Sequence, residues 1–164
     1  MANLYPHQQE AIHFILAGWS RRRVSLLAHD MGTGKTRSAL LASAEAGARR
    51  VLVICPLSVA PVWHKEADEV FGTDWPFQLL VLNYEAAWRR AKEIREYAPD
   101  TIILDESHRI KNPKARQSKF CHELARLPGV RRLALTGTPI SQSPLDCWSQ
   151  CRFIQPDLFQ ASYY

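Results

Sequence analysis

The sequence lacks any apolar run close to the roughly 20 residues that a membrane-spanning helix requires. It also lacks an N-terminal basic stretch followed by an apolar one, the pattern of a secretory signal. We therefore expect no membrane partner. The expected location is the cytoplasm, or the nucleus if the source is a eukaryote.

Cysteine is scarce and is not arranged as metal ligands. The four cysteines are Cys55, Cys121, Cys147 and Cys151. None of them forms a C-x-x-C pair, so the sequence predicts neither a zinc ribbon nor a disulfide framework. We expect reduced, structural thiols.

Internal repeats, low-complexity tracts and linker-like segments are absent too, so we expect a single domain over residues 1–164. A hydrophobic content of 46% with 23% charged residues is typical of a globular chain and excludes a disordered one. The formal net charge of +5 is compatible with a polyanion partner but does not indicate one.

What the sequence does contain is a regular alternation of apolar and amphipathic segments. Five short apolar runs predict strands covered on both faces: 24–28, 51–55, 77–82, 101–105 and 132–137. Helix-like segments lie around them: 7–18, 35–47, 61–70, 84–97, 114–127 and 144–153. This alternation predicts an α/β fold of three layers, a mainly parallel sheet with helices on both faces.

Three polar motifs follow predicted strands, at the edge where ligands bind to sheets of this kind. The first is LAHDMGTGKT (27–36), in which Gly32 and Gly34 allow a tight turn into a helix. Backbone N–H groups there can bind phosphate oxygens, with Lys35 reaching the β- and γ-phosphates and Thr36 holding magnesium. The alternative is an ordinary helix capped by a glycine-rich turn, with Lys35 in solvent.

The second motif is DESH, directly after the apolar run that ends at Leu104. Asp105 would hold magnesium, directly or through water, and Glu106 would orient and deprotonate an attacking water. The alternative is an acidic cap of the following helix. His108 would link this site to a neighbouring element, or it is simply an exposed histidine.

The third motif, LTGTP, brings the hydroxyls of Thr136 and Thr138 to the same edge. They would hydrogen-bond the acidic motif and respond to the γ-phosphate, or they merely close a strand with a turn.

Taken in order, LYPHQQEAI, LAHDMGTGKT, VLVICPLSVAPVWHKE, VLNYE, LDESHRIKN and LTGTPISQSPLDCWSQCRFIQPDLF resemble the first RecA-like domain of Swi/Snf-type ATPases. These are superfamily-two, helicase-like proteins that move along duplex DNA. The resemblance extends from about Leu4 to Phe159 and implies a RecA-like P-loop fold. It also implies ATP and Mg²⁺ as cofactors and duplex DNA as a partner.

The resemblance assigns roles by position. Gln8 matches the glutamine that recognises adenine, although on the sequence alone it would be a solvated helix residue. The phosphate-loop positions implied to bind the nucleotide are Met31, Gly32, Thr33, Gly34, Lys35 and Thr36. His108, Thr136, Gly137 and Thr138 match positions that couple the nucleotide state to domain movement. Positions implied to contact DNA, or alternatively to be ordinary loop residues, are Pro56, Leu57, Ser58, Tyr84, Lys111 and Asn112.

The sequence departs from the family pattern at His29, where the family often has an acidic residue, and at Ser141, Gln142 and Ser143. Proteins of this family continue into a second RecA-like domain that supplies an arginine finger, worth roughly 10³–10⁵ in rate. We expect that domain to be absent from residues 1–164.

The sequence therefore predicts the ATP-binding half of a DNA-dependent ATPase, weakly active or inactive alone. The alternatives are a non-catalytic nucleotide- or DNA-binding module and a P-loop enzyme of another class, such as a kinase or a GTPase.

Overall fold

Five parallel strands form one sheet in the computed structural model, which describes residues 4–22, 24–30, 32–138 and 146–157. The strands are β1 (Val24–Ala28), β2 (Arg50–Cys55), β3 (Gln78–Asn83), β4 (Thr101–Leu104) and β5 (Arg131–Thr136). They lie side by side in the order β1-β5-β4-β2-β3. All neighbouring pairs are parallel; Val53 of β2, for example, pairs with Val81 of β3 on one side and Ile103 of β4 on the other.

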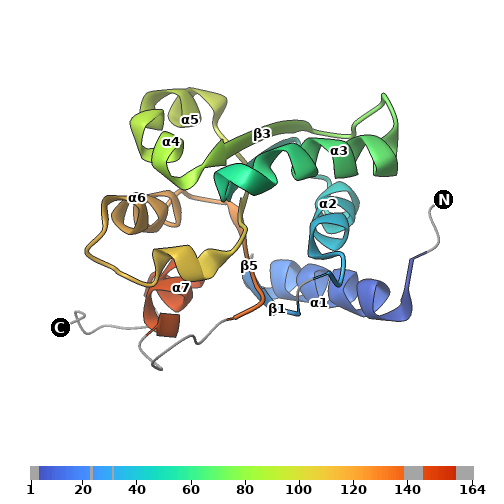
Figure 1. The fold of residues 1–164 in the computed structure, drawn as a ribbon, viewed down its shortest axis with the longest axis horizontal. Coiled ribbons are helices and arrows are strands. Elements are labelled where there is room, and N and C mark those ends of the chain that lie inside the picture. The colour runs from blue at the N-terminus through green and yellow to red at the C-terminus, as the bar shows by residue number, and fades with distance from the viewer. Residues whose placement is uncertain (1–3, 23, 31, 139–145, 158–164) are drawn as a thin grey trace.

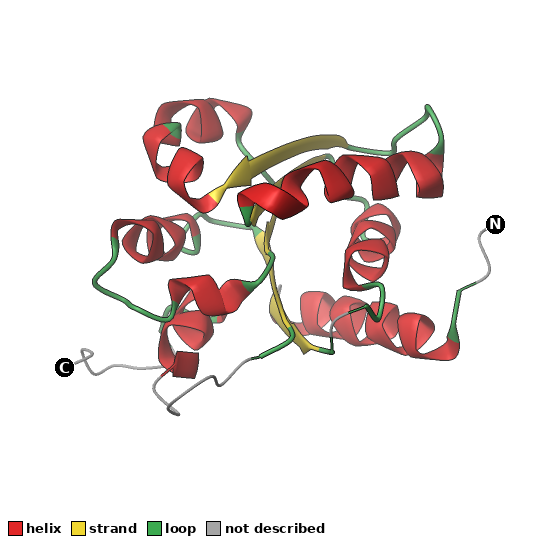
Figure 2. Cartoon of the chain, in the orientation of Figure 1, coloured by secondary structure: helices red, strands yellow, loops and turns green. Residues whose placement is uncertain are grey.

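Helices cover both faces of this sheet (Figures 1 and 2). One face carries α1 (Pro6–Arg22), α2 (Lys35–Glu45) and α3 (Ala60–Phe71). The other carries α4 (Tyr84–Arg89), α5 (Ala91–Tyr97), α6 (Arg116–Leu124) and α7 (Asp146–Ile154). Two short 3-10 helices, η1 (Leu57–Val59) and η2 (Ser107–Ile110), complete the described elements. The fold is the three-layer RecA-like α/β arrangement that the sequence predicts.

The core is divided in two by the sheet because successive side chains of a strand point to opposite faces. Val51 and Val53 of β2 pack with α1, α2 and α3, whereas Leu52 and Ile54 pack with the helices of the other face. All four side chains are fully buried. The continuous apolar runs in the sequence follow from this burial on both faces.

One predicted helix, 84–97, is two helices in the structure. The chain bends at Arg90, whose φ of −99° and ψ of 26° lie outside the helical range, and α5 starts directly after it. Apolar residues keep helical spacing across the bend, with Ala87 and Ile94 both buried. Periodicity therefore indicates helix on both sides but does not reveal the change of direction.

The carboxyl ends of the strands reach one common edge of the sheet. Ala28, the last residue of β1, pairs with Thr136, the last of β5, and Leu104 pairs with Ala134. The three polar motifs follow these positions, so the fold brings them together as predicted. In the part of the chain that the structure describes, none of the helices has the length and apolarity needed to cross a membrane.

Candidate functional site

The glycine-rich loop connects β1 to α2. Gly32 and Gly34 have φ angles of 79° and 75°, in the left-handed region that favours glycine. Gly34 occupies the N-cap of α2, and no side chain caps the first turn. The N–H groups at this helix start therefore have the geometry that binds anions, assisted by the helix dipole. Met31 lies outside the described residues.

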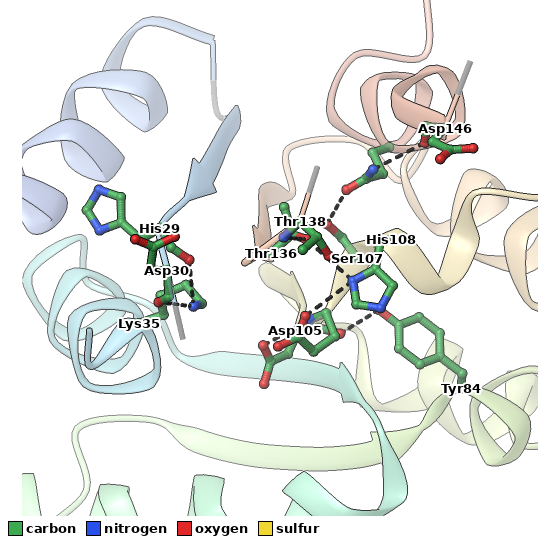
Figure 3. A network of polar contacts seen from close by, with 12 residues as sticks. His29, Asp30, Lys35, Tyr84, Asp105, Ser107, His108, Thr136, Thr138 and Asp146 are labelled. Carbon is green, nitrogen blue, oxygen red and sulfur yellow. Dashed lines mark hydrogen bonds and ion pairs between the residues drawn. The ribbon is translucent and has the colours of Figure 1, made fainter. Parts of the chain in front are cut away.

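Main-chain carbonyl groups of this loop hold the side chain of Lys35 in place. Its Nζ donates hydrogen bonds of 2.8 Å to the carbonyl oxygens of both His29 and Asp30 (Figure 3). The Thr33 hydroxyl donates to the same Asp30 carbonyl at 2.9 Å, and the His29 N–H donates to Thr136 O at 3.2 Å. The Lys35 ammonium group is thus kept at the loop. His29, the position at which the sequence departs from the family pattern, contributes through its main-chain N–H and carbonyl groups.

Gln8 reaches the loop from α1. Its side chain is 6% exposed, and its Oε1 accepts a 3.1 Å hydrogen bond from the Tyr5 N–H. Beside it lies a hollow of about 450 Å³. The lining residues of this hollow are Tyr5, His7, Gln8, Gly32, Thr33, Gly34, Arg37 and Glu66. The structure therefore brings Gln8 and the phosphate loop together, although they are separate in sequence.

Asp105 follows β4 directly and is 5% exposed. Its Oδ2 accepts a 2.9 Å hydrogen bond from Trp63 Nε1, and its Oδ1 accepts one of 2.9 Å from the Glu106 N–H. Burial raises the pKa of the carboxyl above its usual value; the Trp63 hydrogen bond opposes that shift, the Glu106 charge adds to it and the Lys35 charge opposes it. The electrostatic effect of Lys35 reflects how the first two motifs converge on one edge (Figure 3).

Glu106 has an unusual backbone. Its φ of 49° and ψ of 52° are left-handed, which is strained for a residue with a Cβ atom. Its Oε2 is buried and accepts no hydrogen bond from the described residues. The same oxygen lies 3.2 Å from His108 Nδ1, in position for an ion pair when the imidazole is protonated. A strained residue whose buried carboxylate oxygen accepts no hydrogen bond and lies against a histidine is a feature of functional sites.

The third motif contacts the second through His108. Thr136 Oγ1 lies 3.5 Å from His108 Nδ1 and accepts a 3.1 Å hydrogen bond from the Thr138 N–H. Thr136 is fully buried, and Gly137 lies between the two threonines. The residues predicted to couple nucleotide state to movement are therefore neighbours, while that role itself stays a prediction.

The residues predicted to contact DNA differ in exposure. Leu57 is 69% exposed, and Ser58 and Asn112 are exposed as well, whereas Pro56 is buried and Lys111 half-buried. Tyr84 is only 5% exposed, and its hydroxyl donates a 2.7 Å hydrogen bond to the Asp105 carbonyl. The structure thus puts Tyr84 inside the protein rather than on its surface.

Trp63 is a site residue that the sequence reasoning missed. It is fully buried on α3, directly against Asp105. The sequence held one signal for it: a tryptophan in the helix that follows β2. Such a residue, if buried, needs an acceptor for its indole N–H. Within the described ranges, no cluster of three or more His, Cys, Asp or Glu side chains could hold a metal ion.

Comparison with known proteins agrees with this fold. "ATP-dependent DNA helicase DDM1" of Arabidopsis thaliana is 29% identical over 95% of this chain and 24% of its own length. A Caenorhabditis elegans homologue of the SWI/SNF-related matrix-associated actin-dependent regulator of chromatin subfamily A-like protein 1 is 30% identical, over 95% of this chain and 25% of its own. The chain thus spans about a quarter of these relatives.

A solved structure described as the Sulfolobus solfataricus SWI2/SNF2 ATPase core in complex with dsDNA is also similar. It superimposes with a TM-score of 0.80 and 27% identity, covering 98% of this chain and 37% of the archaeal one. The sequence pattern of the SNF2-related domain family matches residues 69–163. This range is more than half of the chain and includes the acidic motif. The resemblance seen in the sequence is confirmed, and the chain belongs to the family of SNF2-related domains.

Proposed function

We propose that this chain binds Mg-ATP and forms the nucleotide-binding part of an ATP-driven motor that moves on duplex DNA. One observation carries the proposal: the Lys35 loop and the Asp105–Glu106 pair come from separate segments and converge on one sheet edge. A chance Gly-Lys-Thr at a helix start has no reason to face an acidic pair that includes the buried Asp105.

The donor set fits a magnesium ion. Magnesium prefers oxygen ligands together with substrate phosphates, and the Thr36 hydroxyl and the Asp105 carboxylate are oxygen donors of that kind. Each Asp105 carboxylate oxygen accepts one hydrogen bond, from Trp63 and from Glu106, which leaves lone pairs available for a cation. When bound, the ion would offset the negative charge of the phosphates.

In the proposed reaction, water attacks the γ-phosphorus of ATP in line, and the bond to the β,γ-bridging oxygen breaks to release ADP. Glu106 would orient the water and accept its proton at its buried Oε2, which accepts no hydrogen bond from the described residues and lies 3.2 Å from His108 Nδ1. Lys35 would exchange its two carbonyl acceptors for phosphate oxygens and offset their charge.

Gln8 supports adenine as the base of the nucleotide. Its carboxamide lies in the hollow beside the loop, where a side chain with both a donor and an acceptor can match the edge of adenine. A kinase or a GTPase of another class has no need of a glutamine at this place. A preference for ATP over GTP would therefore distinguish the proposed motor from a P-loop enzyme of another class.

Efficient turnover would need a second RecA-like domain, in cis or in trans, that supplies an arginine finger worth about 10³–10⁵ in rate. The greater length of the relatives supports this part of the proposal. Duplex DNA would contact the exposed Leu57, Ser58 and Asn112 and the half-buried Lys111, mainly at its backbone. Because the Lys111 ammonium would neutralise a phosphate, binding would weaken as salt is raised. Such a motor would act in the cytoplasm, or in the nucleus of a eukaryote.

The test is equilibrium binding of ATP and GTP with Mg²⁺, followed by steady-state ATP hydrolysis with and without duplex DNA. Lys35→Ala should abolish nucleotide binding. Lys65→Ala is the matched control, because Lys65 is 78% exposed and pairs only weakly with Glu69 at 3.7 Å. Glu106→Gln should bind ATP normally and show no hydrolysis above the Lys35→Ala blank.

The outcomes separate the alternatives. Tight ATP binding with turnover near the blank supports a half-motor, and turnover should then rise when a second RecA-like domain is added. Equal affinity for GTP would favour a P-loop enzyme of another class. Nucleotide binding that is unchanged in Lys35→Ala would remove the phosphate-loop assignment and leave a non-catalytic module.

A further inference from the structure

Trp63 is placed to control the orientation of the Asp105 carboxylate. Its side chain is fully buried on α3, and its indole N–H donates a 2.9 Å hydrogen bond to Asp105 Oδ2. Both partners are buried, so water does not compete for this bond, and the acceptor is a carboxylate. Such hydrogen bonds are the stronger ones in proteins.

Tyr84 holds the same residue from another element. Tyr84 begins α4, is 5% exposed, and donates from its hydroxyl to the main-chain oxygen of Asp105 at 2.7 Å (Figure 3). Trp63 lies on the helix after β2, and Tyr84 follows β3 directly. Asp105, which follows β4, is thus held through its side chain and its backbone by two neighbouring segments.

A third hydrogen bond completes the arrangement. Asp105 Oδ1 accepts from the Glu106 N–H at 2.9 Å, so each carboxylate oxygen has one fixed donor. With both oxygens held, the plane of the carboxylate cannot rotate freely. A ligand that is already oriented binds a cation more tightly than one that must be ordered on binding.

We propose that Trp63 and Tyr84 are positioning residues that hold Asp105 in the orientation required for magnesium. The inference rests on the proposed function, since it concerns the same carboxylate. Neither aromatic side chain touches the nucleotide in this role; both act through Asp105. Their loss should therefore raise the magnesium requirement more than it weakens contact with the nucleotide itself.

The first measurement uses the indole N–H as a spectroscopic probe and needs no nucleotide. The chain has five tryptophans, and the Trp63 indole signal in a ¹H–¹⁵N spectrum is assigned by its loss in Trp63→Phe. In Asp105→Ala the Trp63 signal should move and exchange faster with solvent. The signal of Trp75, whose Nε1 donates to the Gly72 carbonyl at 3.1 Å, should stay in place. A Trp63 signal that does not respond to Asp105→Ala would overturn the proposal.

The second measurement titrates Mg²⁺ at a fixed concentration of a non-hydrolysable ATP analogue. Tyr84→Phe keeps the ring and removes the donor, whereas Trp63→Phe replaces the indole by a smaller phenyl ring that has no donor. The Mg²⁺ midpoint of Trp63→Phe should rise roughly 10-fold, as for other residues that support a metal ligand. Tyr84→Phe should raise the midpoint in the same direction. Affinity for the analogue at saturating Mg²⁺ should change little.

Matched controls exist for both substitutions. Trp75→Phe also removes an indole hydrogen bond to protein, and Tyr97→Phe removes a hydroxyl that donates to the Gln78 carbonyl at 2.8 Å. Neither control contacts Asp105, and both should keep the wild-type midpoint. An equal shift in the controls would show a general loss of stability and would overturn the positioning role.

The two levels of the hypothesis fail in different ways. If the wild-type chain binds no ATP analogue at any Mg²⁺ concentration, the proposed function fails. If the wild-type chain binds it and Trp63→Phe and Tyr84→Phe have unchanged midpoints, only the positioning role fails. Should Trp63→Phe not fold, Tyr84→Phe and the indole signal of Trp63 under Asp105→Ala still decide.

Discussion

A Cβ atom added to Gly34 would lie 2.2 Å from the side-chain nitrogen of Gln8, closer than any two such atoms can approach. The first helix thus packs its buried carboxamide directly onto the phosphate loop, at a residue that also has a φ of +75°. The left-handed backbone therefore favours glycine at this position, and a Cβ atom there would also have to displace the Gln8 carboxamide.

Gly34→Ala should lower both stability and ATP binding. A left-handed conformation costs a non-glycine residue about 1–2 kcal/mol, and the displacement of Gln8 adds to this. The comparison is Gly47→Ala, since Gly47 has a φ of +67° and nothing within 4 Å of an added Cβ. Urea unfolding and ATP titration would measure both. An equal loss of stability in the two variants, with ATP binding retained, would contradict the packing argument.

Glu106→Gly should stabilise the protein while it abolishes hydrolysis. Glycine removes the strain at a φ of 49°, and after the entropy cost in the unfolded chain the net gain should be roughly 0.5–1 kcal/mol. Glu106→Gln retains the strain and should lose hydrolysis without this gain. Thermal unfolding and single-turnover hydrolysis are the measurements.

The control for the strain argument is Ala98→Gly. Ala98 is exposed, has a φ of 47° at the end of α5, and lies outside the site. It should give a similar gain in stability with unchanged ATP binding. If Ala98→Gly stabilises and Glu106→Gly does not, the left-handed conformation of Glu106 is not a source of strain.

His122 should make the protein less stable as the solution becomes mildly acidic. Burial lowers its pKa below the usual 6.5, and the charges of Arg152 and Arg126 lower it further, while the Ser149 carbonyl partly opposes the shift. Between the lowered value and 6.5, the unfolded chain binds more protons than the folded one. The free energy of unfolding therefore decreases as the pH is lowered through this window, by at most about 1.4 kcal/mol per pH unit for one group.

Unfolding free energies measured as the pH falls from 7.5 would test this expectation. His122→Gln should flatten the dependence below pH 6.5, because it removes the buried imidazole that contacts Ser149 at 3.0 Å. His13→Gln replaces an exposed histidine and should keep the wild-type profile. Parallel profiles for wild type and His122→Gln would rule His122 out as the cause.

The buried bond between Ser107 and Gln150 should stabilise the docking of α7 against the acidic motif. Ser107 Oγ donates to Gln150 Oε1 at 2.6 Å, and both side chains are almost fully buried. Gln150→Leu leaves the serine hydroxyl without this acceptor and should cost about 1–3 kcal/mol. Ser107→Ala combined with Gln150→Leu should recover part of that loss in a double-mutant cycle.

Gln117→Leu is the comparison for this bond, because Gln117 Nε2 donates to the Arg109 carbonyl at an exposed place. Its effect on the unfolding free energy should be small, since water can replace the lost partner. Additive effects of Ser107→Ala and Gln150→Leu would mean that the two side chains do not stabilise each other.

Much of the fold could be read from the sequence because its signals are local. Continuous apolar runs specify strands buried on both faces, and the glycine-rich and acidic motifs follow the strands at their carboxyl ends. Parallel crossovers then bring those ends to one edge, so Lys35, Asp105 and Thr136 could be expected near one another. The bend at Arg90 escaped this reasoning, since apolar spacing continues on both sides of it.

The contacts that shape the site were decided by the tertiary structure. These contacts join residues from different segments of the chain: Gln8 packs against Gly34, and Trp63 and Tyr84 both donate hydrogen bonds to Asp105. Their positions depend on how each helix lies on the sheet, a property of the whole core that no short pattern encodes. For the same reason Tyr84, matched by motif to a DNA-contacting segment, is buried in the fold. The sequence by itself determined which chemical groups reach the sheet edge, and packing over long sequence separations decided how each one is oriented there.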